Sequence, residues 1–141
     1  MTIPPLLLLA EGRKPRLRKA PTVRERELKI HMPIAKLLMD HCRPEWRWSH
    51  FPSGEARDAR AGAKLKAMGL QRGWPDFILV SPEGIFHGLE LKAPKGVLSE
   101  SQEGFQTWAN RWNVVYVVAW SIEECLAAFQ EWQCLDPRIK F

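Results

Sequence analysis

A continuous apolar run near the C-terminus constrains the fold more than any other stretch of the sequence. Residues 114–120 read Val-Val-Tyr-Val-Val-Ala-Trp after Asn113, so β-branched and aromatic side chains would project from both faces of an extended chain. A strand that is apolar on both faces is typical of the middle of a sheet whose two faces are covered by helices. The run therefore predicts an α/β fold with a buried central strand.

Helix and strand patterns alternate along the rest of the chain. Helical patterns cover residues 23–42, 55–68, 99–112 and 121–132, and strand patterns cover 45–51, 77–80 and 85–92. A Pro-Glu-Gly turn at 82–84 joins the last two strands as a hairpin. The resulting order, α, β, α, β, β, α, β, α, predicts one domain over residues 23–141, with a central mixed β-sheet flanked by α-helices.

The first expected helix contains a proline. A stripe at helical spacing would face the core, and it comprises Glu27, Ile30, His31, Ile34, Leu37, Leu38 and His41. Pro33 lies within this helix, removes a backbone donor and crowds the preceding turn. We therefore expect a kink or a break at Pro33.

Basic residues gather in two places. The net charge is +5, and residues 1–22 contribute five basic residues against Glu11. This segment has no steady period, so we expect a flexible arm that either binds a phosphate backbone or an anionic surface, or is a solvated tail. The second cluster has spacings of three and four residues that would place it on one side of a helix, to contact nucleic acid; it comprises Arg57, Arg60, Lys64, Lys66 and Arg72.

Cysteine usage and hydropathy limit the environment. Three cysteines, Cys42, Cys125 and Cys134, cannot all pair within one chain, and none has a zinc-type spacing. The apolar run at 3–10 contains two prolines, is too short to span a bilayer, and lacks the flanks of a signal peptide. We expect a cytoplasmic protein in a reducing compartment, without a membrane partner or structural zinc.

Charged residues interrupt the predicted hairpin. Because side chains alternate along a strand, Glu90 and Lys92 share one face. Asp76 enters the partner strand and, counted outwards from the turn, falls opposite residue 89 or 90. Two facing carboxylates can hold one Mg²⁺ ion, and a nearby lysine can orient or deprotonate a water. The set suits phosphodiester hydrolysis without a serine or cysteine nucleophile.

These residues and their surroundings resemble a nuclease family. The pattern Pro75-Asp76 followed by Glu90-Leu91-Lys92 resembles the PD-(D/E)xK superfamily. With Gly73-Trp74, Pro94-Lys95-Gly96 and Ser99-x-x-Gln102 added, the pattern resembles the VRR-NUC (virus-type replication-repair nuclease) group from about residue 27 to residue 129. The resemblance implies a restriction-endonuclease-like core and a Mg²⁺-dependent DNA endonuclease in which Mn²⁺ can substitute. The chain resembles the stand-alone members of phages and bacteria, which implies action on branched or Holliday-junction DNA, as a homodimer, in replication, repair or recombination.

The resemblance also implies a role for each residue of the site. Asp76 and Glu90 would bind the metal, with the backbone carbonyl of Leu91 as a further ligand. Lys92 would act on the attacking water, and Gln102 would position Lys92 or that water. Glu27 would reach the metal through water, and Lys95 would join the basic cluster at the DNA. No small-molecule cofactor is implied.

Several alternatives stay open. Gln102 can serve only as the capping-box partner of Ser99, and Glu27 can serve only as a cap or ion-pair partner. His50 could meet a phosphate, whereas His87 lies on the face opposite Glu90 and is expected to be a core or surface histidine. A non-catalytic nucleic-acid-binding or DNA-packaging module would have no need of all three charged residues. A sequence-reading restriction enzyme would need a recognition element that the chain has little length to supply.

Overall fold

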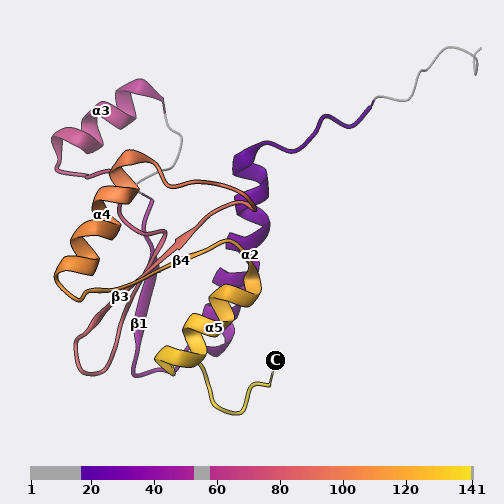
Figure 1. Ribbon diagram of the computed structural model, residues 1–141, viewed down its shortest axis with the longest axis vertical. Helices are drawn as coiled ribbons and strands as arrows, with labels where there is room; N and C mark the ends of the chain where they lie inside the picture. Colours follow the sequence, from indigo (N-terminus) through magenta and orange to yellow (C-terminus); the bar gives the residue numbers. More distant parts are fainter. Residues whose placement is uncertain (1–16, 53–57, 141) are drawn as a thin grey trace, which may run out of the picture.

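A computed structural model describes residues 17–52 and 58–140. In these residues four helices and the four strands of one sheet follow one another in the predicted order (Figure 1). Helices α2 (Val23–His41) and α5 (Ile122–Trp132) lie together on one side of the sheet, and α4 (Glu100–Arg111) lies on the other. The chain is thus an α/β protein with a mixed sheet, as the sequence predicts.

The first described helix, α2, runs from Val23 to His41. It begins with a complete capping box, in which Thr22 and Glu25 bind each other's backbone N–H groups. Of the predicted kink or break at Pro33, the break is wrong because the helix continues through Pro33, and the kink stays a prediction. Pro33 and Lys29, whose carbonyl loses its helical donor, are both exposed, so water can solvate that carbonyl. The predicted core stripe is confirmed except at His41, which is exposed.

The sheet has the strand order β1-β2-β3-β4. Its strands are β1 (Arg47–His50), β2 (Phe77–Val80), β3 (Phe86–Leu91) and β4 (Val115–Ala119). The first three are antiparallel neighbours, and β4 pairs parallel to β3. The prediction that 114–120 forms the central strand is wrong, because β3 lies inside the sheet and β4 at its edge. The apolar side chains of β4 are explained by α4 and α5, because both helices contact this strand.

The sheet separates two apolar layers. On one face, Ile34 and Leu38 of α2 and Phe129 of α5 pack against buried residues such as Phe77 and Leu89. On the other face, an aromatic cluster joins the sheet to α4 (Glu100–Arg111), with Phe105 as its centre. The ring of Phe105 lies 5.2 to 6.4 Å from four others, those of Trp74, Phe86, Trp108 and Tyr116.

Helix α3 (Ala59–Ala67) differs from the others because it has no buried residue. Asp58 caps its first turn, and Gly69 follows it in a left-handed conformation, with φ of 101°. The last helix, α5, covers Ile122–Trp132 and is capped by Ser121. Within 17–52 and 58–140, none of the helices is long and apolar enough to cross a membrane.

Candidate active site

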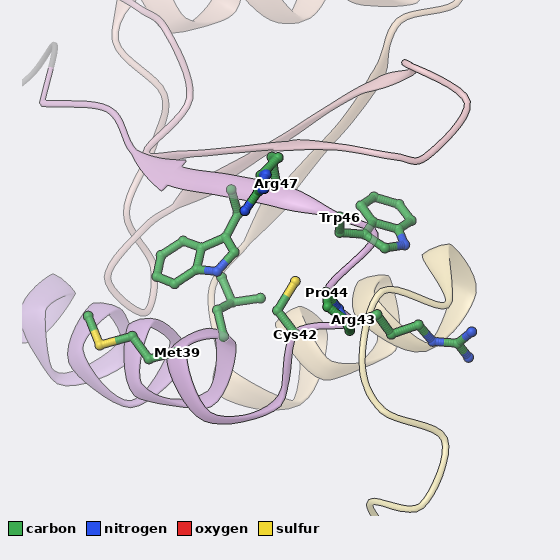
Figure 2. Close-up of a pocket in the computed structure, with 8 residues that line it drawn as sticks. Met39, Cys42, Arg43, Pro44, Trp46 and Arg47 are labelled. Atoms are coloured by element: carbon green, nitrogen blue, oxygen red, sulfur yellow. The ribbon is translucent and has the colours of Figure 1, made fainter.

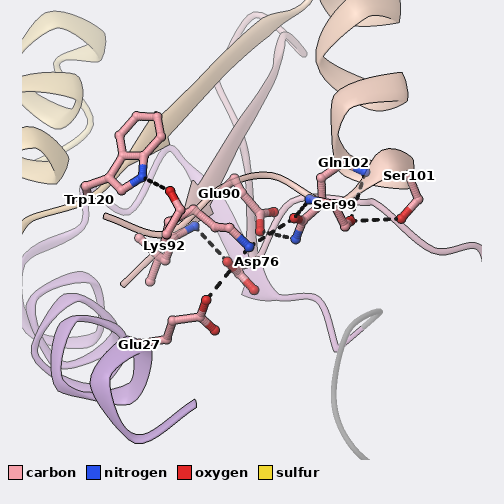
Figure 3. Close-up of polar contacts among 10 residues, drawn as sticks. Glu27, Asp76, Glu90, Lys92, Ser99, Ser101, Gln102 and Trp120 are labelled. Atoms are coloured by element: carbon pink, nitrogen blue, oxygen red, sulfur yellow. Dashed lines mark hydrogen bonds and ion pairs between the residues drawn. The ribbon is translucent and has the colours of Figure 1, made fainter. Parts of the chain in front are cut away.

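The hairpin of β2 and β3 brings the two carboxylates of the predicted site together. Phe77 pairs with Leu89, so Asp76 lies next to Glu90 at the open end of the hairpin, as predicted. Asp76 Oδ2 accepts a hydrogen bond of 2.7 Å from the backbone N–H of Leu91. Figure 3 shows Asp76, Glu90 and Lys92 converging on one point, with Glu27 approaching from α2.

Two glycines allow this close approach. A Cβ at Gly88 would lie 2.8 Å from Cγ of Pro75, so the bare backbone at position 88 lets Pro75 rest on β3. Gly73 has φ of 86°, and a Cβ there would lie 2.3 Å from the carbonyl oxygen of Ser101. The segment that carries Asp76 is therefore packed directly on the first turn of α4.

That first turn carries Gln102, which has both of the roles that the sequence left as alternatives. Its Oε1 accepts from the backbone N–H of Ser99 at 2.9 Å and from Nζ of Lys92 at 3.0 Å. Its Nε2 donates to Oε1 of Glu90 at 2.6 Å. The capping box fixes the side chain, and the fixed amide then holds one acidic and one basic group of the site (Figure 3).

Lys92 lies between Gln102 and Glu27. Its side chain is 12% exposed, and Nζ is 3.8 Å from Oε1 of Glu27. Glu27 thus reaches the site through Lys92, and its predicted contact with a metal through water stays a prediction.

Burial and mutual repulsion dominate the electrostatics of the two carboxylates. Glu90 is almost fully buried, and burial together with the charge of Asp76 raises the pKa of Glu90 to about 9. Burial also raises the pKa of Asp76, against the opposing effect of its hydrogen bond from Leu91. Lys92 favours the charged form of both but does not outweigh burial. A divalent cation would supply the missing positive charge.

The donor set fits such an ion. Oε2 of Glu90 is buried, and no donor in the described part of the chain reaches it. An orphaned buried carboxylate oxygen is costly unless a cation binds it. Among residues 17–52 and 58–140, no three His, Cys, Asp or Glu side chains form a metal-binding group. Mg²⁺ needs only one or two carboxylates, since it retains several waters, and Asp76 and Glu90 meet that requirement.

The basic residues expected at the DNA are described only in part, and those on α3 do not all share one face. Arg57 lies outside the described residues, and Arg72 follows α3 in a loop. Arg60 and Lys64 are four residues apart and share a face of α3, whereas Lys66 is two positions beyond Lys64 and points to the other side. Arg60 and Lys64 therefore share one side of α3 without Lys66, all four described members are exposed, and their contact with DNA stays a prediction.

Two neighbouring features escaped the sequence analysis. Lys95 is exposed and adopts a left-handed conformation, with φ of 64°, in the turn after β3. The indole N–H of Trp120 donates to the carbonyl of Gly96 at 2.7 Å and so holds this turn (Figure 3). An indole donor aimed at a loop carbonyl leaves no pattern in a sequence.

His87, expected in the core or on the surface, is buried between the rings of Trp46 and Trp132.

A separate groove lies between α2 and β1 (Figure 2). Met39, Cys42, Trp46 and Trp48 line it, together with Arg43 and Arg47. It contains none of the acidic residues of the site, and Arg43 is engaged with the carbonyl of Leu135. The groove is therefore distinct from the candidate active site.

Comparison of the chain with protein-family models, with curated proteins and with solved structures found no match.

Proposed function

We propose that the chain is a metal-dependent DNA endonuclease with a restriction-endonuclease-like core, similar to the VRR-NUC group. The observation that carries the proposal is the convergence of Asp76, Glu90 and Lys92 at the open end of one hairpin. Buried carboxylates with raised pKa values are typical of functional sites, because such an arrangement costs stability. A purely structural role would not require two acids and a lysine at one point.

Each residue has a distinct part in the proposed reaction. Asp76 and Glu90 would hold Mg²⁺ or Mn²⁺, with the carbonyl of Leu91 as a further ligand. A bound ion would polarise the phosphoryl oxygen and lower the pKa of the attacking water. Lys92, oriented by Gln102, would place its ammonium group against the negative charge that grows on the phosphate. Gln102 would keep Glu90 and Lys92 at a fixed separation.

We place DNA against this site and along the exposed cations of α3. Arg60 and Lys64 can neutralise phosphates, and the turn at Lys95 presents another cation beyond β3. Branched or Holliday-junction DNA is the proposed substrate, and a homodimer with two-fold symmetry would place one site on each of two strands. Light scattering measures whether the protein dimerises.

The decisive experiment incubates the protein with linear, nicked, flapped and four-way DNA. Cleavage is measured with Mg²⁺, with Mn²⁺, and with a chelator, for the wild type and for Asp76→Asn. Glu131→Gln is the control, because Glu131 is an exposed acid on α5. We expect cleavage only with metal, loss in Asp76→Asn, and wild-type activity in the control. Full cleavage in chelator would refute the metal mechanism, and DNA binding without cleavage in either metal would favour a non-catalytic module.

A further inference from the structure

Asp76 is held by its backbone as well as by its side chain. Its carbonyl oxygen accepts one hydrogen bond from the N–H of Phe51 at 2.8 Å and another from Nδ1 of His50 at 2.9 Å. A carbonyl can only accept, so Nδ1 of His50 carries the proton in this contact. Two donors at one carbonyl fix the plane of the peptide bond that follows Asp76.

The orientation of that peptide helps to fix the backbone at Cα of Asp76, from which the carboxylate projects. Phe51 supplies the ordinary backbone contact that continues the pairing of β1 with β2. The His50 contact is additional, because it comes from a side chain at the end of β1. With the Leu91 N–H on the carboxylate itself, Asp76 is held by donors from both neighbouring strands. Little freedom remains for the carboxylate to turn away from Glu90.

The His50 ring is itself held in place. His31 packs edge-on against it with ring centres 4.6 Å apart, and Phe77 lies 5.9 Å away. His31 lies one helical turn beyond Glu27 on α2. The ring contacts therefore join the helix that carries Glu27 to the strand that follows Asp76, and they keep Nδ1 aimed at the Asp76 carbonyl.

We propose that His50 is a positioning residue for the metal site, which fixes the direction of the Asp76 carboxylate through the Asp76 backbone carbonyl. This inference rests on the proposed function, which identifies the site as a metal site, and it adds the residue that orients the Asp76 carboxylate. Groups that orient metal ligands in this way contribute about 10- to 100-fold to metal affinity or activity.

Two substitutions separate the hydrogen bond from the packing of the ring. His50→Phe keeps an aromatic ring but removes the donor. His50→Asn removes the ring, but its amide Nδ2 occupies the position of Nδ1 and can donate to the same carbonyl. Trp48→Phe is the control, because Trp48 also lies on β1 and contacts Phe77, 6.1 Å between ring centres. The readouts are Mn²⁺ affinity by calorimetry, kcat and KM on DNA, and thermal unfolding.

We expect His50→Phe to weaken Mn²⁺ binding by about tenfold or more and to lower kcat with KM for DNA unchanged. His50→Asn should restore Mn²⁺ affinity to within about threefold of wild type, and Trp48→Phe should leave it unchanged. Wild-type Mn²⁺ affinity in His50→Phe, or an equal loss in Phe and Asn variants, would overturn the proposal.

Two further outcomes are distinguishable. If wild type binds Mn²⁺ but cleaves no DNA, the proposed function fails and the positioning role is still decided by the affinities. If wild type does not bind Mn²⁺, both proposals fail. Should His50→Phe not fold, His50→Asn is compared with His50→Gln, whose amide lies one methylene too far along the side chain; equal affinities in that pair would overturn the proposal.

Discussion

Replacing Glu90 by glutamine should stabilise the metal-free protein while abolishing metal binding. Glu90 is buried beside Asp76, and its pKa is raised to about 9. At neutral pH the folded protein therefore keeps this carboxyl protonated, whereas the unfolded chain releases the proton. Folding must take up a proton, and the free energy of unfolding falls as the pH rises. Glutamine is neutral at every pH and can still accept the hydrogen bond from Gln102.

The magnitude follows from the two pKa values. The group has a pKa of 4.5 when unfolded and about 9 when folded, so at pH 7 the uptake of one proton costs about 3 kcal/mol. The sign is that of a raised acid: the cost is absent below pH 4.5, grows by about 1.4 kcal/mol per pH unit, and levels off above pH 9. The difference in free energy of unfolding between Glu90→Gln and wild type should thus increase by about 4 kcal/mol, in favour of Glu90→Gln, as the pH rises from 5 to 8.

Urea unfolding in chelator across that pH range measures the difference. Glu131→Gln serves as the control, because Glu131 is exposed and its replacement should give a nearly constant difference. Mg²⁺ should stabilise wild type and leave Glu90→Gln unchanged. A stability difference between wild type and Glu90→Gln that is independent of pH would refute the reasoning, since the burial of Glu90 would then carry no proton-linked cost.

The remaining predictions concern the lysine, a glycine and the cations of α3. Lys92→Ala should lower kcat at least 100-fold with Mn²⁺ affinity retained, measured by single-turnover cleavage and calorimetry; wild-type turnover would exclude its catalytic role. Gly73→Ala should lower the free energy of unfolding by about 2–4 kcal/mol, because it combines a left-handed backbone with a clash against Ser101. Gly69→Ala, with a similar φ but open space, should cost only about 1–2 kcal/mol, and equal losses would show that the clash is relieved elsewhere. Neutral residues at the exposed cations of α3 should flatten the salt dependence of DNA binding by up to about 0.9 per lost phosphate contact, and an unaltered slope would move the DNA path away from this helix. These cations are Arg60, Lys64 and Lys66.

Local sequence patterns predicted the helices and strands of this fold. The order of the strands and the contacts of Gln102 could not be predicted, because they depend on contacts between elements distant in the sequence. The hairpin register could be counted from its turn, so the meeting of Asp76 and Glu90 was predictable. The edge position of β4 was not predictable. Apolar side chains show that helices cover both faces of a strand, but they do not show whether a further strand pairs with it. Likewise, the spacing of Ser99 and Gln102 predicted a capping box, but the contacts of Gln102 with Lys92 and Glu90 depend on how α4 packs against the sheet.

The hairpin that carries both acids also bears on how fast the chain folds. It is the shortest connection between strands in the described sheet, since only residues 81–85 separate β2 from β3. Short loops close early, whereas the pairings of β1 with β2 and β3 with β4 must wait for longer segments. The like charges of Asp76 and Glu90 therefore meet before the rest of the sheet is assembled. We expect their repulsion to slow refolding, so that Glu90→Gln should refold faster than wild type in chelator at neutral pH.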